Sequence, residues 1–168
     1  KIDYDGLQLY KKIYNSVGTP GTTPATAAAL LAAGQRLDEE AAPRDKNRGM
    51  YLNPAANAGL VGGLTGLFNN QQKISKQYDT GNMGAAFGFN MSMDQNVATH
   101  TNGPRGGTPL VNGASQSGAS LITDGWTAAA ASRVKEGDVF TLAGVYAVNP
   151  QNRVSTGVLR QFTVTANG

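Results

Sequence analysis

The sequence predicts a mixed α+β fold, with helices concentrated in residues 1–101 and short strands in residues 102–168. The first indication is the alanine-rich stretch 25–42, because alanine has the highest helix propensity. The second is the change after His100, where short apolar runs alternate with turn-forming Gly, Asn and Pro. We therefore expect an α/β domain over residues 1–101, followed by a β-rich domain over residues 102–168.

Three helices are expected in the first domain, over residues 4–17, 24–42 and 54–68. The second and third begin with the same device, a capping side chain followed by proline at the first helical position, in Thr23–Pro24 and Asn53–Pro54. The third helix is expected to bury a leucine face, formed by Leu60, Leu64 and Leu67. Its four glycines match neither the dinucleotide fingerprint nor the phosphate loop, so we expect them to allow close packing.

The expected strands are short and are bounded by turn residues; they cover residues 50–52, 86–93, 120–123, 139–148 and 159–165. Turns are expected at residues 18–21, 44–48 and 81–84. Residues 73–79 fit either a short helical turn or an extended link, and residues 101–118 read as a loop.

The composition provides few large side chains for a core. The 168 residues include 22 Gly and 23 Ala, whereas Leu, Ile, Val and Phe together number 33. A chain this long suits one domain, or one domain with a small appendage, and should bury about 70% of its unfolded surface. With so little bulk, we expect partner chains to complete the burial.

Cysteine is absent, which excludes disulfides, cysteine zinc sites and thiol catalysis. The longest apolar run, residues 27–33, is too short to span a bilayer, and no secretory signal is visible. The net charge of +3 is a small imbalance rather than a basic patch. At most, weak nonspecific contact with DNA through residues such as Arg133 or Lys135 is expected.

No candidate catalytic, cofactor or metal site emerges from the motifs. The single histidine, His100, lies where a strand runs into a loop and is expected to be a surface or hinge residue. Asp45 and Asn47 lack the other ligands of a calcium loop and are expected to form a turn. The acidic run Asp38-Glu39-Glu40 fans around a helix, so a solvated face or an inter-subunit contact is expected rather than a metal site.

Two long stretches carry a family resemblance. The first is YLNPAANAGLVGGLTGLFN at 51–69 followed by ISKQYDTGNMGAAFGFNMSMDQNVATHTNG at 74–103, and the second is GASQSGASLITDGWTAAAASRVKEGDVFTLAGVYAVNP at 113–150. They resemble the major capsid proteins of tailed bacteriophages, in particular the coat-protein type of the short-tailed Salmonella phages. The resemblance implies a Hong Kong 97-like axial domain, a central sheet flanked by helices, followed by a β-rich insertion domain or the first part of one. Because such coat proteins are much longer, the chain is expected to correspond to the middle of one.

By this resemblance the protein is a structural subunit of an icosahedral capsid rather than an enzyme. It would be located in the virion after assembly in the host bacterial cytoplasm. Its partners would be copies of itself, together with scaffolding and portal proteins, with DNA enclosed and no membrane contact. The expected interface residues are Asp38, Glu39, Glu40, Arg44 and Trp126. Trp126 could equally be a core anchor.

Two alternatives stay open. Residues 102–168 alone would suit a β-rich binding module of a phage tail or cell surface, and exposed aromatic residues with carbohydrate binding would favour it. A small hydrolase using His100 is the other, although no nucleophile elbow accompanies this histidine.

Overall fold

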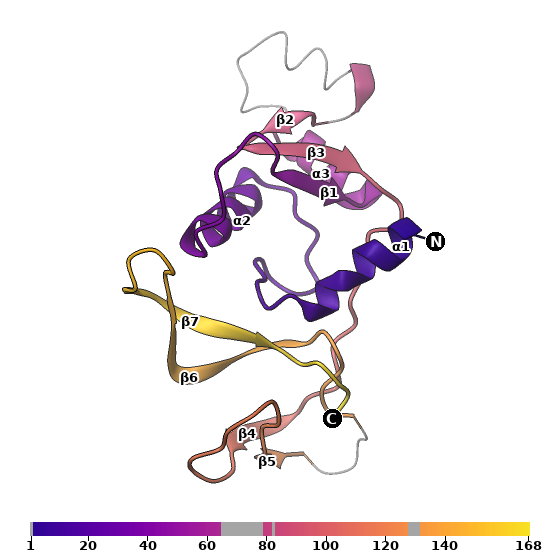
Figure 1. Ribbon diagram of the computed structural model, residues 1–168. Coiled ribbons are helices and arrows are strands. Elements are labelled where there is room, and N and C mark those ends of the chain that lie inside the picture. The colour runs from indigo at the N-terminus through magenta and orange to yellow at the C-terminus, as the bar shows by residue number, and fades with distance from the viewer. Residues whose placement is uncertain (1, 65–78, 82, 128–131) are drawn as a thin grey trace.

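The computed structural model describes residues 2–64, 79–81, 83–127 and 132–168. Figure 1 shows a three-stranded sheet with helices beside it, a long hairpin below, and a second, short hairpin at the far end. Helices and strands both occur, so the predicted mixed α+β class is confirmed. The finer expectation of a Hong Kong 97-like arrangement and the boundary near residue 102 stay predictions.

A strand–helix–strand unit forms the centre of the first sheet. Strand β1 (Gly49–Leu52) leads into helix α3 (Pro54–Leu64), and β1 then pairs in parallel with β3 (Phe89–Met93). Strand β2 (Ala85–Ala86) adds to the other edge of β3 in the antiparallel direction. The parallel pairing requires a crossover connection, which here contains α3. The predicted strand at residues 50–52 is confirmed.

The prediction of one strand over residues 86–93 is wrong, because the chain reverses within it. Phe87 and Gly88 have φ angles of 52° and 83° and form the two-residue turn of a hairpin. Two successive positive φ angles suit the twist of flanking antiparallel strands. Phenylalanine rarely occupies such a position, so the turn carried no sequence signal; packing of Phe87 against the core favours it here.

The hydrophobic core lies where α2, α3 and the sheet meet. Its buried side chains come from these elements and from the turn before β2: Leu30, Leu52, Ala56, Leu60, Met83, Phe89 and Met91. Along β3 the burial alternates, with Phe89 and Met91 inward and their neighbours outward. This core is small for a chain of this length, in line with the composition.

Helix α3 begins as the sequence predicts. The Asn53 side-chain oxygen accepts a hydrogen bond from the Ala56 N–H at 2.7 Å, which satisfies a free donor of the first turn. Leu60 on the predicted leucine face is fully buried. The predicted continuation over residues 65–68, with Leu67, lies outside the described residues, as does most of the segment 73–79.

Helix α2 spans Ala27–Glu39 rather than residues 24–42. Thr26, not Thr23, occupies the N-cap position, and its side chain makes no capping hydrogen bond. Pro24 and Ala25 stay outside the helix because their backbone lies against α3. A Cβ added at Gly59 of α3 would lie 3.4 Å from the Pro24 carbonyl oxygen, and one at Gly63 would overlap that of Ala25. The predicted packing role of these two glycines is therefore confirmed.

The first helix is shorter than predicted. Helix α1 (Ile2–Leu7) continues as the 3₁₀ helix η1 (Gln8–Lys12), and the chain becomes extended at Ile13. Residues 13–16 then run beside strand β7, where the Gln161 amide accepts from Ser16 N–H at 2.9 Å and donates to the Ser16 carbonyl at 3.1 Å. Thr163 donates to the Ile13 carbonyl at 2.9 Å. These tertiary hydrogen bonds explain why residues 13–17 are not helical.

Two hairpins follow residue 106. Strand β6 (Val139–Val148) matches the prediction and pairs with β7 (Ser155–Thr163), which begins earlier than predicted. The rings of Phe140 and Phe162 stack across this pair at 5.6 Å. Strands β4 (Gly107–Val111) and β5 (Thr123–Trp126) form the second hairpin.

The prediction of a loop over 101–118 is therefore wrong for β4, and the strand predicted at 120–123 lies three residues later. These two strands contain residues that do not favour a regular strand: Gly107 and Gly125, which have positive φ angles, and Pro109. The sequence therefore did not predict them correctly.

The contact between α3 and the Pro24–Ala25 segment leads to a first prediction. Gly63→Ala forces these backbones apart and should lower the free energy of unfolding by about 1–3 kcal/mol. Gly62→Ala is the matched control, because its Cβ would meet nothing within 4 Å; it should raise stability by up to ~1 kcal/mol through helix propensity. Chemical denaturation followed by circular dichroism measures both. Equal effects of the two substitutions would contradict the close contact.

Candidate functional site

The acidic run at the end of α2 is engaged within its own chain. Asp38 accepts from Arg44 Nε at 3.1 Å with both carboxylate oxygens, and from Arg44 Nη2. Arg48 Nη2 donates to the same carboxylate at 2.9 Å. Arg44 is four-fifths exposed, whereas the Arg48 side chain is nearly buried. Asp38 therefore joins the helix end to the turn that follows it.

A tight reversal of the chain creates this arrangement. The Ala42 N–H donates to the Leu37 carbonyl at 2.9 Å, and Ala41 between them has a φ of 58°. This is the Schellman ending of a helix, with alanine at the position that glycine usually occupies. Arg48 also donates to the Ala42 carbonyl at 2.7 Å, just beyond the end of the helix. The basic side chains also suit the negative end of the helix dipole.

Hydrogen bonds from Arg44, and then from Arg48, lower the pKa of Asp38 from 3.8 to about 2. The same interaction raises the pKa of the Arg44 guanidinium. Asp38 is therefore ionised at neutral pH and in mild acid.

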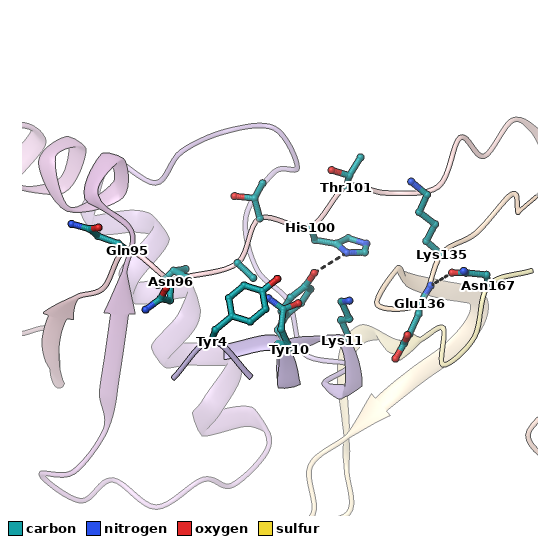
Figure 2. A pocket seen from close by; sticks show the side chains of 14 residues that line it. Tyr4, Tyr10, Lys11, Gln95, Asn96, His100, Thr101, Lys135, Glu136 and Asn167 are labelled. Atoms are coloured by element: carbon teal, nitrogen blue, oxygen red, sulfur yellow. Dashed lines mark hydrogen bonds between the residues drawn. The ribbon is translucent and has the colours of Figure 1, made fainter. Parts of the chain in front are cut away.

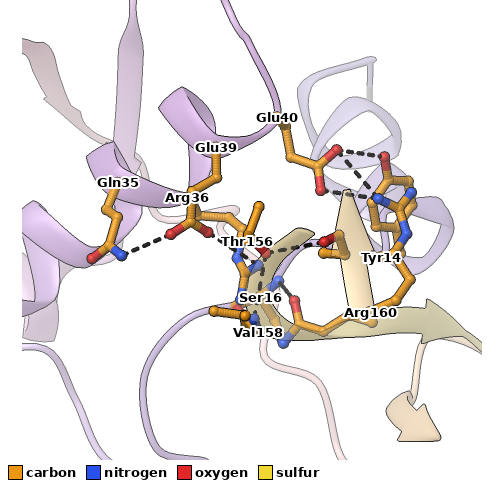
Figure 3. Close-up of polar contacts among 12 residues, drawn as sticks. Tyr14, Ser16, Gln35, Arg36, Glu39, Glu40, Thr156, Val158 and Arg160 are labelled. Atoms are coloured by element: carbon orange, nitrogen blue, oxygen red, sulfur yellow. Dashed lines mark hydrogen bonds and ion pairs between the residues drawn. The ribbon is translucent and has the colours of Figure 1, made fainter. Parts of the chain in front are cut away.

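Glu40 links α2 to the long hairpin, as Figure 3 shows. Arg160 of β7 donates to Glu40 at 3.1 Å, and the Tyr14 hydroxyl donates to the same carboxylate at 3.2 Å. The Arg160 guanidinium also lies 4.2 Å from the centre of the Tyr14 ring, a cation–π contact. Glu39 instead pairs along its own helix, with Gln35 at 2.7 Å and Arg36 at 3.4 Å.

The predicted interface residues do not form one cluster. Asp38, Glu39, Glu40 and Arg44 lie together at the end of α2, whereas Trp126 lies in β5, which Figure 1 shows at the bottom of the view, beyond the β6–β7 hairpin from α2. Trp126 is partly buried, and its indole N–H donates to the Thr123 hydroxyl at 2.8 Å. Contact of these residues with a second copy stays a prediction.

A second polar centre surrounds His100, where sequence reasoning singled out no partner. His100 Nε2 lies 2.7 Å from a carboxylate oxygen of Asp138, and His100 Nδ1 lies 3.2 Å from the Tyr10 hydroxyl. Figure 2 shows Tyr10 and His100 in a groove of about 600 Å³, with Lys11 and Lys135 nearby. Tyr10 belongs to η1, His100 to the connector after β3, and Asp138 to the turn before β6. We call this meeting point of three segments the His100–Asp138 junction.

Asp138 is 1% exposed and is charged nonetheless. Burial raises its pKa, but hydrogen bonds from His100 and from the Lys135 and Gly103 N–H groups lower it, assisted by the charge of Arg105. The balance holds the pKa of Asp138 below its usual value. An ionised Asp138 accepts a hydrogen bond from Nε2–H of His100. This leaves Nδ1 of His100 as the acceptor of a hydrogen bond from the Tyr10 hydroxyl.

Gly137 allows the segments to approach this closely. It has a φ of 95°, and a Cβ at this position would lie 3.1 Å from Lys11 Cγ and 3.2 Å from His100 Cε1. In the sequence, Asp138 follows a glycine at the start of a predicted strand, a pattern shared by many exposed turn aspartates. The only available signal was a lone histidine that needed a partner somewhere in the fold.

The junction holds three segments of the chain together. Both ring nitrogens of His100 have hydrogen-bond partners within the chain, Tyr10 on one side and Asp138 on the other. Within the described ranges, no group of three His, Asp or Glu side chains could hold a metal ion. Asp45 accepts from Asn47 N–H at 3.1 Å, the turn that the sequence predicts.

The two candidate DNA contacts differ in their surroundings. The Arg133 guanidinium donates to the backbone carbonyl of Arg105 at 2.7 Å and to that of Thr127, so it braces the base of the β4–β5 hairpin. Lys135 is exposed at the edge of the groove. Among the helices in the described part of the chain, none has the length and apolar character to cross a membrane.

Comparison of the chain with models of known protein families finds no match, and comparison with curated proteins likewise finds no related sequence.

The buried charge at the junction leads to a second prediction. Asp138→Asn keeps the size of the side chain but leaves one of its three donors without a good acceptor. It should lower the free energy of unfolding by about 2–3 kcal/mol at pH 7. Glu136→Gln removes the same charge from the neighbouring turn and should change stability by less than about 0.5 kcal/mol. Urea denaturation compares them, and a wild-type midpoint for Asp138→Asn would rule out the tethering role.

The Asp38 cluster leads to a third prediction, about acid stability. Because the folded pKa of about 2 lies below the unfolded value, ionised Asp38 stabilises the fold fully above roughly pH 4–5. This contribution is lost as the pH falls toward 2. In Asp38→Asn, the decline of unfolding free energy across this window should be shallower than in the wild type. Asp5→Asn removes an exposed carboxylate away from the arginines and serves as the charge control; equal slopes for the wild type and Asp38→Asn would refute the assignment.

Proposed function

We propose that this chain is a structural subunit of a bacteriophage capsid, and that copies of it bury surface against one another. The observation that carries the proposal is the exposed area. A compact monomer of this mass exposes about 7,900 Å², whereas the chain of 17.4 kDa exposes 11411 Å². The excess, on the order of 3,500 Å² per copy, is what one copy would bury in about two obligate interfaces, since each such interface buries on the order of 2,000–5,000 Å² counted over both partners.

The exposed surface is also apolar in many places. Ile2, Leu9, Leu31 and Leu110 are each more than half exposed, although leucine and isoleucine are among the residues most often buried. Scattered exposed leucines are ordinary, but here large apolar residues are exposed on helices and strands throughout the fold. The thin core and the apolar exterior together support a chain that is completed by its neighbours.

The capsid assignment in particular is supported by the resemblance in residues 51–69, 74–103 and 113–150. The features that carry it lie at consistent places in the fold: Asn53–Pro54 joins β1 to α3, and Gly88-Phe89 opens β3. A Hong Kong 97-like axial domain with a β-rich insertion domain, a location in the virion, and scaffolding and portal partners belong to the same proposal.

The β-rich binding module is the second candidate, because the β4–β5 hairpin exposes apolar side chains on both faces. A binding module would act as a monomer and recognise a glycan or another receptor. A shell subunit would associate with itself.

Sedimentation velocity over a range of concentrations tests the proposal and is the fourth prediction. The chain should associate beyond its 17.4 kDa monomer as the concentration rises, and electron microscopy should show closed or curved assemblies. Reversing the charge of Asp38 would be a poor probe, because that carboxylate holds Arg44 and Arg48 within its own chain. Leu31→Lys, on the exposed side of α2, should weaken association and leave folding intact. A strictly monomeric chain that binds glycans would instead favour the binding module.

A further inference from the structure

Two separate surfaces of the described chain combine exposed apolar side chains with an unpaired charge. The hairpin surface lies on β4–β5 and comprises Leu110, Val111, Leu121 and Ile122. The tip surface lies around the loop joining β6 to β7 and comprises Val145, Tyr146, Val148, Val154 and Val158. Figure 1 places the first at the bottom of the view and the loop at its left edge, well apart.

We propose that the hairpin surface of one copy packs against the tip surface of the next, so that copies join head to tail. The inference rests on the proposed self-assembly and names the surfaces and the partner. Such a heterologous contact uses two different patches on each copy and closes into rings when the rotation permits.

The hairpin surface needs a covering element. A two-stranded sheet alone is at best marginally stable in water. The pairing places Leu110 and Ile122 on one face and Val111 and Leu121 on the other, so both faces are apolar. Leu110 is 67% exposed and Ile122 is 62% exposed. Within the described residues, both faces therefore lack the cover that such a hairpin needs.

The tip surface is ordered by its own loop. Asn149 N–H donates to the Val154 carbonyl at 3.0 Å, and Arg153 N–H donates to the Asn149 carbonyl at 2.9 Å. The Asn149 side chain accepts from Gln151 N–H at 2.8 Å. These bonds hold the apolar side chains and Arg153 in fixed positions at the end of the hairpin.

Arg153 has a backbone conformation that is strained for an arginine. Its φ is 56°, in the left-handed region where glycine is favoured. Non-glycine residues in such conformations cluster at functional sites. Arg153 is exposed, and no ionic partner for it is found in the described part of the chain. The charge of Arg153 is therefore available to a group outside its own chain.

The opposite surface carries the complementary charge. Asp124 of β5 is exposed, lies on the same face as Leu110 and Ile122, and has no ionic partner among the described residues. An acidic group amid one apolar surface and a basic group beside the other would pair in a head-to-tail contact. In a symmetric contact of either surface with itself, like charges would approach each other, which disfavours it.

The apolar area available to one contact is modest. If a large side chain offers roughly 150 Å² when fully exposed, Leu110 and Ile122, on the face that carries Asp124, present about 190 Å² of apolar area. A standard interface buries about 800 Å² per partner, a little over half of it apolar. This face thus supplies under half of the apolar share of one interface, and neighbouring residues of the two copies supply the rest.

Cross-linking tests the geometry, because the chain has no cysteine of its own. One copy carries Ile122→Cys, the other carries Val154→Cys, and a short bismaleimide joins thiols that lie close together. The mixture should give predominantly the 122-to-154 dimer, with few dimers from either variant alone. Leu9→Cys, exposed on η1, replaces Ile122→Cys as the control and should give no enrichment with Val154→Cys.

Charge exchange supplies a second readout, by sedimentation. Asp124→Arg or Arg153→Asp alone should weaken association about fivefold, the upper end for an exposed ion pair, and the double variant should restore it. Arg153→Gly should unfold at a higher temperature, because it relieves strain, while associating more weakly. A merely structural arginine would show no such divergence.

The outcomes separate the two proposals. Symmetric 122-to-122 or 154-to-154 products, or association with no mixed product, would overturn the head-to-tail contact and leave self-assembly standing. A chain that stays monomeric at every concentration would overturn the proposed function and this inference with it.

Discussion

The ionised carboxylate of Asp138 is the interaction on which the arrangement of the chain depends. It is almost fully buried, and three donors converge on it: His100 and Gly103 from the connector after β3, and Lys135 from its own turn. A buried charge is costly unless it is surrounded by donors, so the segments that supply them are held in place. Its own backbone carbonyl accepts from Val164 N–H at 2.9 Å, which ties the end of β7 to the same point. With few large apolar side chains available, one satisfied charge takes over part of the role of a core.

Charged side chains also hold the end of α2 in place. Asp38 and Glu40 project from one helix end in different directions, and each reaches a different part of the chain. Asp38 closes the turn that feeds β1, while Glu40 connects with Tyr14 and Arg160. A run of three acidic residues, which reads as a solvated face, thus holds the helix layer against the long hairpin. The apolar core proper is confined to α2, α3 and the first sheet.

Local patterns predicted the elements whose signals are local. Asn53–Pro54 predicted the start of α3, because a capping residue and a proline act within one helical turn. Strand β6 was predicted with its observed bounds because its apolar run is long. The start of α2 was misplaced because contact with the glycines of α3, distant in sequence, keeps Pro24 outside the helix. The turn at Phe87 depends on the packing of its ring rather than on a turn-forming residue. At the candidate site, the acidic run was visible in the sequence, whereas the pairing of His100 with Asp138 joins residues 38 positions apart. Separations of this kind leave no periodic or motif signal in a single sequence.

The strap formed by residues 13–16 has a mechanical consequence. It is held against β7 by the side chains of Gln161 and Thr163 and by the contact of Tyr14 with Arg160, which together take the place of a neighbouring strand. Peeling it away breaks none of the backbone hydrogen bonds between β6 and β7, so the hairpin keeps its ladder. A load applied to the first helix would therefore open this seam one bond at a time, before it reached the sheet. Residues 13–16 can therefore detach from β7 while the hairpin stays folded. Detachment of the N-terminal segment is a local opening event with a small free-energy cost of its own.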